Sequence, residues 1–167
     1  DKAASNKIIN NKFFILLGKG SRLNLIDFYK PDNNVKYFYN SVHNYTIKEN
    51  SILKKFNINS NLDNSYNYIS TKVKNYSNSI FEHFLLSLGS TFIKNEVHCD
   101  LMDEFSSCFI NGIMFLDGKQ HHELKTNVNH IFKNCKSSQL IKSVLFDKSN
   151  GNYQGKIYVD KNAQKTN

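Results

Sequence analysis

The chain has 167 residues, 40% of them hydrophobic and 13% aromatic, which is enough for one folded domain with its own core. The longest apolar run, Phe13 to Leu17, is too short to cross a bilayer, and the first residues lack the pattern of a signal peptide. The net charge of +8 is scattered lysine, with Arg22 the only arginine. Nucleic-acid recognition favours clustered arginine, so we expect no nucleic-acid partner, and we expect no membrane partner either. We attribute the abundant lysine and asparagine to an AT-rich genome.

Three cysteines, Cys99, Cys108 and Cys135, form an odd set without a closely spaced pair. Such a set is typical of reduced thiols in a cytosol-like compartment rather than of a disulfide framework. A structural zinc site would need four ligands at tight spacing, and the sequence does not contain that pattern.

Taken in chain order, five segments share a small residue followed by an apolar, strand-like stretch. The segments are GSRLNLIDFY, NSILKKFNIN, NSIFEHFLLSL, SSCFINGIMFL and SSQLIKSVLF. Their serines, which are 30, 28, 28 and 31 residues apart, are Ser21, Ser51, Ser79, Ser107 and Ser138. Two positions after each serine stands an apolar residue: Leu23, Leu53, Phe81, Phe109 and Leu140. A repeat of this length predicts stacked structural units.

A second strand-like stretch precedes the later serines. NEVHCDLMD and ELKTNVNHIF alternate with the period of two that is typical of strands, and only SIFEHFLLSL has a weak helical spacing. We therefore predict an all-β fold, a parallel β-helix or solenoid with rungs of about 28–31 residues. A sandwich of antiparallel hairpins is the alternative. Residues 1–20 would form the opening strand or N-terminal edge, and residues 21–167 the core of a segment that we expect to continue beyond residue 167.

One polar column is predicted inside this solenoid. The residues eight positions before the last four serines are His43, Thr71, Cys99 and His130. His130 shares a strand face with Leu124, so it should point toward the core. We expect a ladder of stacked polar side chains that hydrogen-bond one another, because a buried polar group without a partner costs roughly 1–3 kcal/mol. A route for a ligand or a transferred group is the alternative.

The stretch from His121 to Cys135 invites a catalytic or metal-binding interpretation, which its spacing supports poorly. His121-His122-Glu123 contains the H-x-E of zinc deaminases without the downstream P-C-x-x-C, and H-E-x-x-H is absent. His121, His130 and Cys135 are therefore only weak metal candidates. A nucleophile pair of Cys135 with His130 or His121 would lack a third, orienting residue. A β-helical carbohydrate-active enzyme or binding protein is the alternative function, and it would need carboxylates gathered on an outer groove.

Residues 117–167 contain a long run of motifs in order. The run consists of Asp117-Gly118, Gln120-His121, Thr126, Val128, His130, Cys135, Ser137, Lys142, Tyr153 to Ile157, Val159 and Ala163 to Thr166. It closely resembles the core of the SufB/SufD family, the scaffold proteins of the SUF pathway for iron–sulfur cluster assembly. Residues 25–56 are more similar in style to SufD than to SufB. The earlier part, residues 20–116, resembles the family only through its rung-like pattern.

The resemblance implies a right-handed parallel β-helix and a scaffold subunit rather than an enzyme. It implies a protein complex with the SufB or SufD paralogue and with a SufC-type ABC ATPase. It carries over no catalytic residue and no cofactor bound by this segment, and an iron–sulfur cluster would be held transiently by the full complex. The implied location is the cytoplasm of a bacterium, such as an AT-rich endosymbiont, or a plastid-type organelle.

The sequence also departs from the family. Leu124 and Lys125 stand where the family often has two histidines, which weakens a metal site at residues 121–130. Lys133 and Ser143 replace a frequent proline and a frequent glycine.

Several of the matching residues are expected to have packing roles. Gly155 should let the chain turn between rungs. Gln164 and Thr166, on either side of Lys165, should lie at a rung corner, where their side chains can pair with turn backbone.

Overall fold

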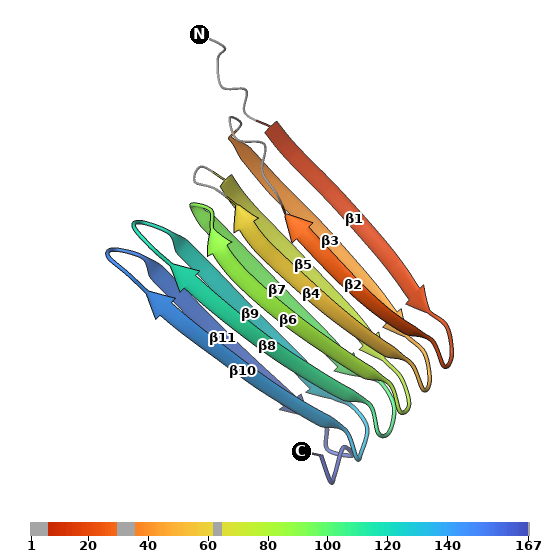
Figure 1. Ribbon diagram of the computed structural model, residues 1–167. Helices are drawn as coiled ribbons and strands as arrows, with labels where there is room; N and C mark the ends of the chain where they lie inside the picture. Colours follow the sequence, from red (N-terminus) through yellow and green to blue (C-terminus); the bar gives the residue numbers. More distant parts are fainter. Residues whose placement is uncertain (1–6, 30–35, 62–64, 167) are drawn as a thin grey trace.

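The computed structural model describes residues 7–29, 36–61 and 65–166 (Figure 1). Within these ranges the chain forms β-strands and no helix, so none of the described residues belongs to a helix that could span a membrane. The strands are β1 (Lys7–Leu17), β2 (Arg22–Tyr29), β3 (Tyr37–Ile47), β4 (Ile52–Asn61), β5 (Ser65–Asn75), β6 (Ile80–Gly89), β7 (Phe92–Leu101), β8 (Ser107–Leu116), β9 (His121–His130), β10 (Lys136–Leu145) and β11 (Asn150–Val159).

The strands form two parallel sheets that are the two walls of a solenoid (Figure 1). Sheet A has the order β1-β3-β5-β7-β9-β11, and sheet B has the order β10-β8-β6-β4-β2. Consecutive strands of the chain alternate between the sheets, and every paired neighbour is parallel. The predicted parallel solenoid is therefore confirmed, and the antiparallel hairpin sandwich is wrong. The segment SIFEHFLLSL is extended, as strand β6.

The coils are nearly equal in length. In sheet B the register pairs Arg22 with Ile52, Ile52 with Ile80, Ile80 with Ser107, and Ser107 with Lys136, so the coils contain 30, 28, 27 and 29 residues. In sheet A the same offset ranges from 26 to 30 residues. The 26-residue step joins β5 to β7. It is short because only Ser90 and Thr91 connect β6 to β7, and Gly89 and Ser90 both have positive φ.

A left-handed residue followed by a small polar residue forms one corner of each coil. The left-handed residues are Gly20, Asn50, Asn78, Phe105 and Asn134, with φ between 52° and 70°. The residues that follow them are Ser21, Ser51, Ser79, Ser106 and Cys135. Hydroxyls at these positions donate to turn carbonyls, as Ser51 Oγ does to Gly18 O at 2.7 Å and Ser106 Oγ to Asp103 O at 2.7 Å.

This corner corrects the predicted serine column. Ser21, Ser51 and Ser79 occupy the corner as expected, but the next two members are Ser106 and Cys135 rather than Ser107 and Ser138. Ser107 begins strand β8, and Ser138 pairs with Phe109 inside sheet B. Counting serines alone missed the left-handed residue that fixes the position of the corner.

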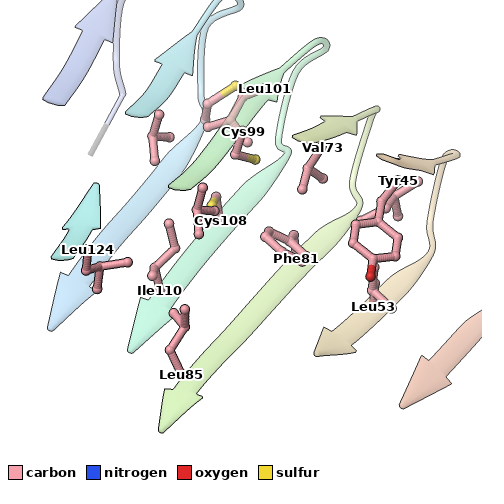
Figure 2. Close-up of a cluster of buried hydrophobic side chains, with 14 of the residues drawn as sticks. Tyr45, Leu53, Val73, Phe81, Leu85, Cys99, Leu101, Cys108, Ile110 and Leu124 are labelled. Atoms are coloured by element: carbon pink, nitrogen blue, oxygen red, sulfur yellow. The ribbon is translucent and has the colours of Figure 1, made fainter. Parts of the chain in front are cut away.

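The space between the sheets holds both apolar and polar side chains. Leu53, Phe81 and Cys108 of sheet B lie near Val73 and Cys99 of sheet A in the hydrophobic core (Figure 2). Full burial of each large apolar side chain stabilises the fold by about 1.5–3 kcal/mol. Burial alternates along the strands, so inward polar side chains such as Lys55, Thr71 and His83 come from the same strands as the apolar ones.

Candidate functional site

The four residues predicted as one column all lie inside the solenoid. His43, Thr71, Cys99 and His130 are each at most 2% exposed. His43 pairs with Thr71 as predicted, but Thr71 is followed by Val97, and Cys99 and His130 lie in the next two columns. The single ladder is therefore wrong beyond its first step. The reason is the 26-residue coil, which displaces Cys99 by two positions from an even 28-residue spacing.

The densest polar cluster surrounds Lys55 of β4. Its ammonium nitrogen Nζ lies 3.3 Å from Asp27 Oδ2, 3.2 Å from Thr71 Oγ1 and 3.4 Å from His43 Nδ1. The Tyr45 ring centroid is 5.2 Å from Nζ, within the range of a cation–π contact. These groups come from β2, β3, β4 and β5, so one ammonium group connects both sheets over three coils. Burial lowers the pKa of Lys55 to about 8, and the nearby Asp27 carboxylate opposes that shift.

Both ring nitrogens of His43 have polar neighbours. Nδ1 lies 2.9 Å from Tyr45 Oη, 3.4 Å from Lys55 Nζ and 3.4 Å from Asp27 Oδ2. Nε2 lies 2.7 Å from Ser41 Oγ. Burial, assisted by the charge of Lys55, lowers the pKa of His43 to about 3. The cluster can share protons internally, but Lys55, His43 and Thr71 are closed to solvent, so no substrate reaches them.

Buried polar atoms without partners continue from this cluster along the solenoid. His83 of β6 is the register neighbour of Lys55, and neither of its ring nitrogens has a hydrogen-bond partner among the described residues. Burial, together with the charge of Lys55, holds the pKa of His83 well below its usual value. Asn57, Asn59 and Asn67 each have an unpaired side-chain oxygen within the same described part of the chain. Packing alone gives no reason for such groups, so we take the inward polar side chains around Lys55 and His83 as the candidate functional site.

The three cysteines are buried free thiols in the hydrophobic core. Cys99 of β7 and Cys108 of β8 lie in the same apolar region (Figure 2). A hydrogen bond with Cys108, with burial adding to it, raises the pKa of Cys99 well above its usual value. Cys135 Sγ lies 3.4 Å from Ser106 Oγ and from Asp103 O, so it takes the place of a corner serine. The Cys99 thiol, held protonated in this way, is a poor nucleophile.

The structure separates the weak metal candidates. His121 points outward, stacks on Phe92 with ring centroids 5.5 Å apart, and pairs with Glu123 at 3.1 Å. His130 points inward, and its Nε2 lies 2.8 Å from Ser137 Oγ. Cys135 is at the corner. In residues 7–29, 36–61 and 65–166, no group of three or more His, Cys, Asp or Glu side chains could hold a metal ion.

The remaining motif residues have structural positions. Gly118 has a φ of 60° in the turn between β8 and β9, where its N–H donates to Asp117 Oδ1 at 2.7 Å. Lys142 is exposed on the outer side of β10. Gly155 does not form a turn. It lies inside β11, paired with Thr126, and a Cβ there would stand 2.7 Å from the Tyr153 hydroxyl.

The predicted rung corner near the end of the chain is present. Lys165 has a φ of 60°, like the left-handed residue of each earlier corner, and Thr166 follows it. Asn134 N donates to Gln164 O, which repeats the bond from Asn50 N to Ser77 O three coils earlier. The Gln164 side-chain amide donates to Lys161 O at 3.1 Å.

The outer side of sheet A has a polar hollow of about 640 Å³, which bears on the carbohydrate alternative. Two carboxylates line it, Glu96 and Asp100. Glu96 accepts a hydrogen bond from the Tyr68 hydroxyl at 2.9 Å, and Asp100 pairs with His98 at 3.0 Å and with Asn129 at 2.7 Å. Neighbouring side chains therefore engage both of the carboxylates in the hollow.

Sequence reasoning missed the centre of the polar cluster. Lys55 stands at an inward position of β4, between Leu53 and Asn57, and Asp27 stands at an inward position of β2. The signal was available, because charged residues that fall in phase with apolar ones along a strand point the same way as they do. Lys55 was instead grouped with the scattered surface lysines.

The family described as "SUF system FeS cluster assembly, SufBD core domain" matches residues 2–167. No curated protein and no solved structure matches the chain.

Proposed function

Because the chain belongs to the SufBD core domain family of the SUF iron–sulfur cluster assembly system, we propose that it is a non-enzymatic scaffold subunit of that machinery. The observation that carries the proposal is the extent of the match, residues 2–167, which includes both walls of the solenoid. A stack of parallel coils with a register fixed by backbone hydrogen bonds is a rigid frame. Such a frame can present partners and a growing cluster in constant geometry, with the cluster as cargo.

The proposal includes the partners. The chain would act in a complex with its SufB- or SufD-type paralogue and with an ABC-type ATPase that supplies nucleotide-driven motion. We assign the chain to the SufD type, on the style of residues 25–56, so its paralogue would be of the SufB type. The three buried, reduced thiols support a reducing compartment, either a bacterial cytoplasm or a plastid-type organelle.

Co-purification tests this assignment. The tagged chain is co-expressed with a SufB-type paralogue and the ATPase, and the purified sample is given ferrous iron and sulfide without oxygen. We expect both partners to co-elute, and cluster absorbance to appear on the complex and not on the isolated chain. The double variant Glu96→Gln, Asp100→Asn in the outer hollow should leave both results unchanged. Failure of the partners to co-elute, or a stoichiometric cluster on the chain alone, would overturn the scaffold role.

A further inference from the structure

The outer hollow of sheet A extends across several coils of the solenoid. Its lining residues come from β1, β3, β5, β7 and β9, which are consecutive neighbours in the sheet (Figure 1). Neighbouring strands lie about 4.8 Å apart, so the hollow is about 19 Å long in the direction across the strands. Its volume of about 640 Å³ falls in the range of binding sites. Its length suits an extended ligand better than a compact one.

Three lysines of this hollow have ammonium groups without an ion-pair partner. Lys72 and Lys74 stand at successive outward positions of β5, and Lys125 stands outward on β9. All three side chains are exposed. In residues 7–29, 36–61 and 65–166, none of the three belongs to an ion pair, whereas Lys54 and Lys94 do. The hollow therefore offers three cations to a ligand with negative charge.

The two carboxylates of the hollow are directed to other side chains than these lysines. Glu96 Oε2 accepts a hydrogen bond from the Tyr68 hydroxyl, and Glu96 Oε1 lies 3.9 Å from Lys94 Nζ. Asp100 Oδ1 lies 3.0 Å from His98 Nε2. The carboxylates disfavour a ligand of dense negative charge, such as the phosphate backbone of a nucleic acid. A peptide, whose carboxylates alternate with neutral groups, is compatible with them.

An exposed aromatic ring lines the hollow at its β1 end. Phe14 is 71% exposed and pairs in register with Asn44 of β3, which in turn pairs with Lys72 of β5. Lys125 lies two strands beyond Lys72 in the sheet. Phe14 and Lys125 therefore stand at opposite ends of the hollow, with Lys72 and Lys74 midway between them. This order gives the hollow one apolar end and two cationic positions.

We propose that the outer hollow docks an extended acidic segment of a partner protein. An extended chain advances about 3.3 Å per residue, so about six residues cross the hollow. Carboxylates of the segment pair with Lys72, Lys74 and Lys125, and an apolar residue at one end of the segment packs on Phe14. Charge complementarity of this kind determines the choice of partner and the rate of association more than the affinity. We therefore expect binding that is rapid and sensitive to salt.

Fluorescence anisotropy of the full chain with the labelled peptide FEDEDE tests the proposal. The measurement needs no other SUF protein, so its outcome is independent of the scaffold role. We expect saturable binding that the neutral peptide FQNQNQ does not show, and a Kd that rises at least about 5-fold between about 50 and about 300 mM NaCl. The triple variant Lys72→Ala, Lys74→Ala, Lys125→Ala should raise the Kd at least about 10-fold, because it removes three exposed charge pairs.

A matched control removes the same charge from exposed lysines outside the hollow, by Lys136→Ala, Lys142→Ala and Lys148→Ala. It should change the Kd less than about 2-fold. Phe14→Ala should raise the Kd about 3-fold, and Phe28→Ala, at an exposed phenylalanine of sheet B, should leave it unchanged. Equal losses in the two triple variants, no binding at millimolar peptide, or tighter binding of an oligothymidylate than of FEDEDE would overturn the proposal.

Discussion

Lys55 Nζ lies 3.3 Å from Asp27 Oδ2, and this ion pair joins the first two strands of sheet B inside the solenoid. The Lys55 side chain is fully buried, whereas the Asp27 side chain is 18% exposed. Desolvation of the ammonium group opposes the attraction, so the pair contributes to the specificity of the register at least as much as to net stability. The ion pair between Lys55 and Asp27 can form in only one alignment of β2 on β4.

Removing the cation from this pair should destabilise the fold strongly. Lys55→Met leaves the Asp27 carboxylate without its buried partner, and we expect a loss of about 3 kcal/mol in the free energy of unfolding by urea. The double variant Lys55→Met, Asp27→Leu should recover much of that loss. Lys54→Met, at the exposed neighbouring position, should cost less than about 1 kcal/mol. If Lys55→Met lowers the free energy of unfolding no more than Lys54→Met does, the ion pair between Lys55 and Asp27 has no structural role.

The inward histidines should make the fold sensitive to acid. Burial is the largest cause of the lowered pKa of His43, His83, His122 and His130. In the unfolded chain these rings bind protons near pH 6.5, and in the folded chain they do so only at lower pH. The unfolded state therefore gains protons first, and stability falls as the pH drops below about 6.5, by up to about 1.4 kcal/mol per pH unit for each ring.

Urea unfolding at pH 7.5, 6.0 and 5.0 measures this slope. His83→Leu should reduce the change in the free energy of unfolding per pH unit by the contribution of one histidine ring. It should also raise the free energy of unfolding at pH 7.5, because it removes the unpaired nitrogens of His83. A stability that is flat between pH 7.5 and 5.0 would contradict the neutral, buried state of these histidines.

Phe105 stands in a backbone conformation that suits other residues better. Its φ is 59° at the corner position where Gly20, Asn50, Asn78 and Asn134 stand in other coils, and its side chain is 54% exposed. A left-handed residue without a suitable side chain costs about 1–2 kcal/mol. Phe105→Asn should therefore raise the melting temperature. Phe132→Asn removes a similarly exposed phenylalanine whose φ is not positive, and it should bring no such gain.

Cys135 should be replaceable by serine. It occupies the corner that Ser21, Ser51, Ser79 and Ser106 fill in the earlier coils, and serine can donate to Asp103 O as the thiol does. We expect Cys135→Ser to change the free energy of unfolding by less than about 0.5 kcal/mol, and Cys135→Val to cost about 1 kcal/mol or more through lost hydrogen bonding. If Cys135→Ser abolishes cluster assembly while the fold remains intact, Cys135 has a chemical role.

The sequence predicted the architecture well and the interior less well. The repeat of Ser21, Ser51 and Ser79 and the period of two along the strands together predict a parallel solenoid, because backbone pairing between coils needs little more than equal lengths. The positions of Cys99 and His130 could not be predicted from an even spacing, because one two-residue turn shortens a single coil. The contacts of an inward side chain such as Lys55 depend on which residues of the opposite sheet face it. The pattern along a single strand does not show which residues those are.

The left-handed corners have an evolutionary consequence. Asn50, Asn78 and Asn134 fill three of the six described, and asparagine is among the few residues other than glycine that adopt this backbone readily. Mutation toward adenine-rich codons multiplies asparagine, which weakens helices. In a solenoid with left-handed corners, each coil has a position at which the additional asparagine is favourable. This fold therefore tolerates a mutational bias that would destabilise a helical protein.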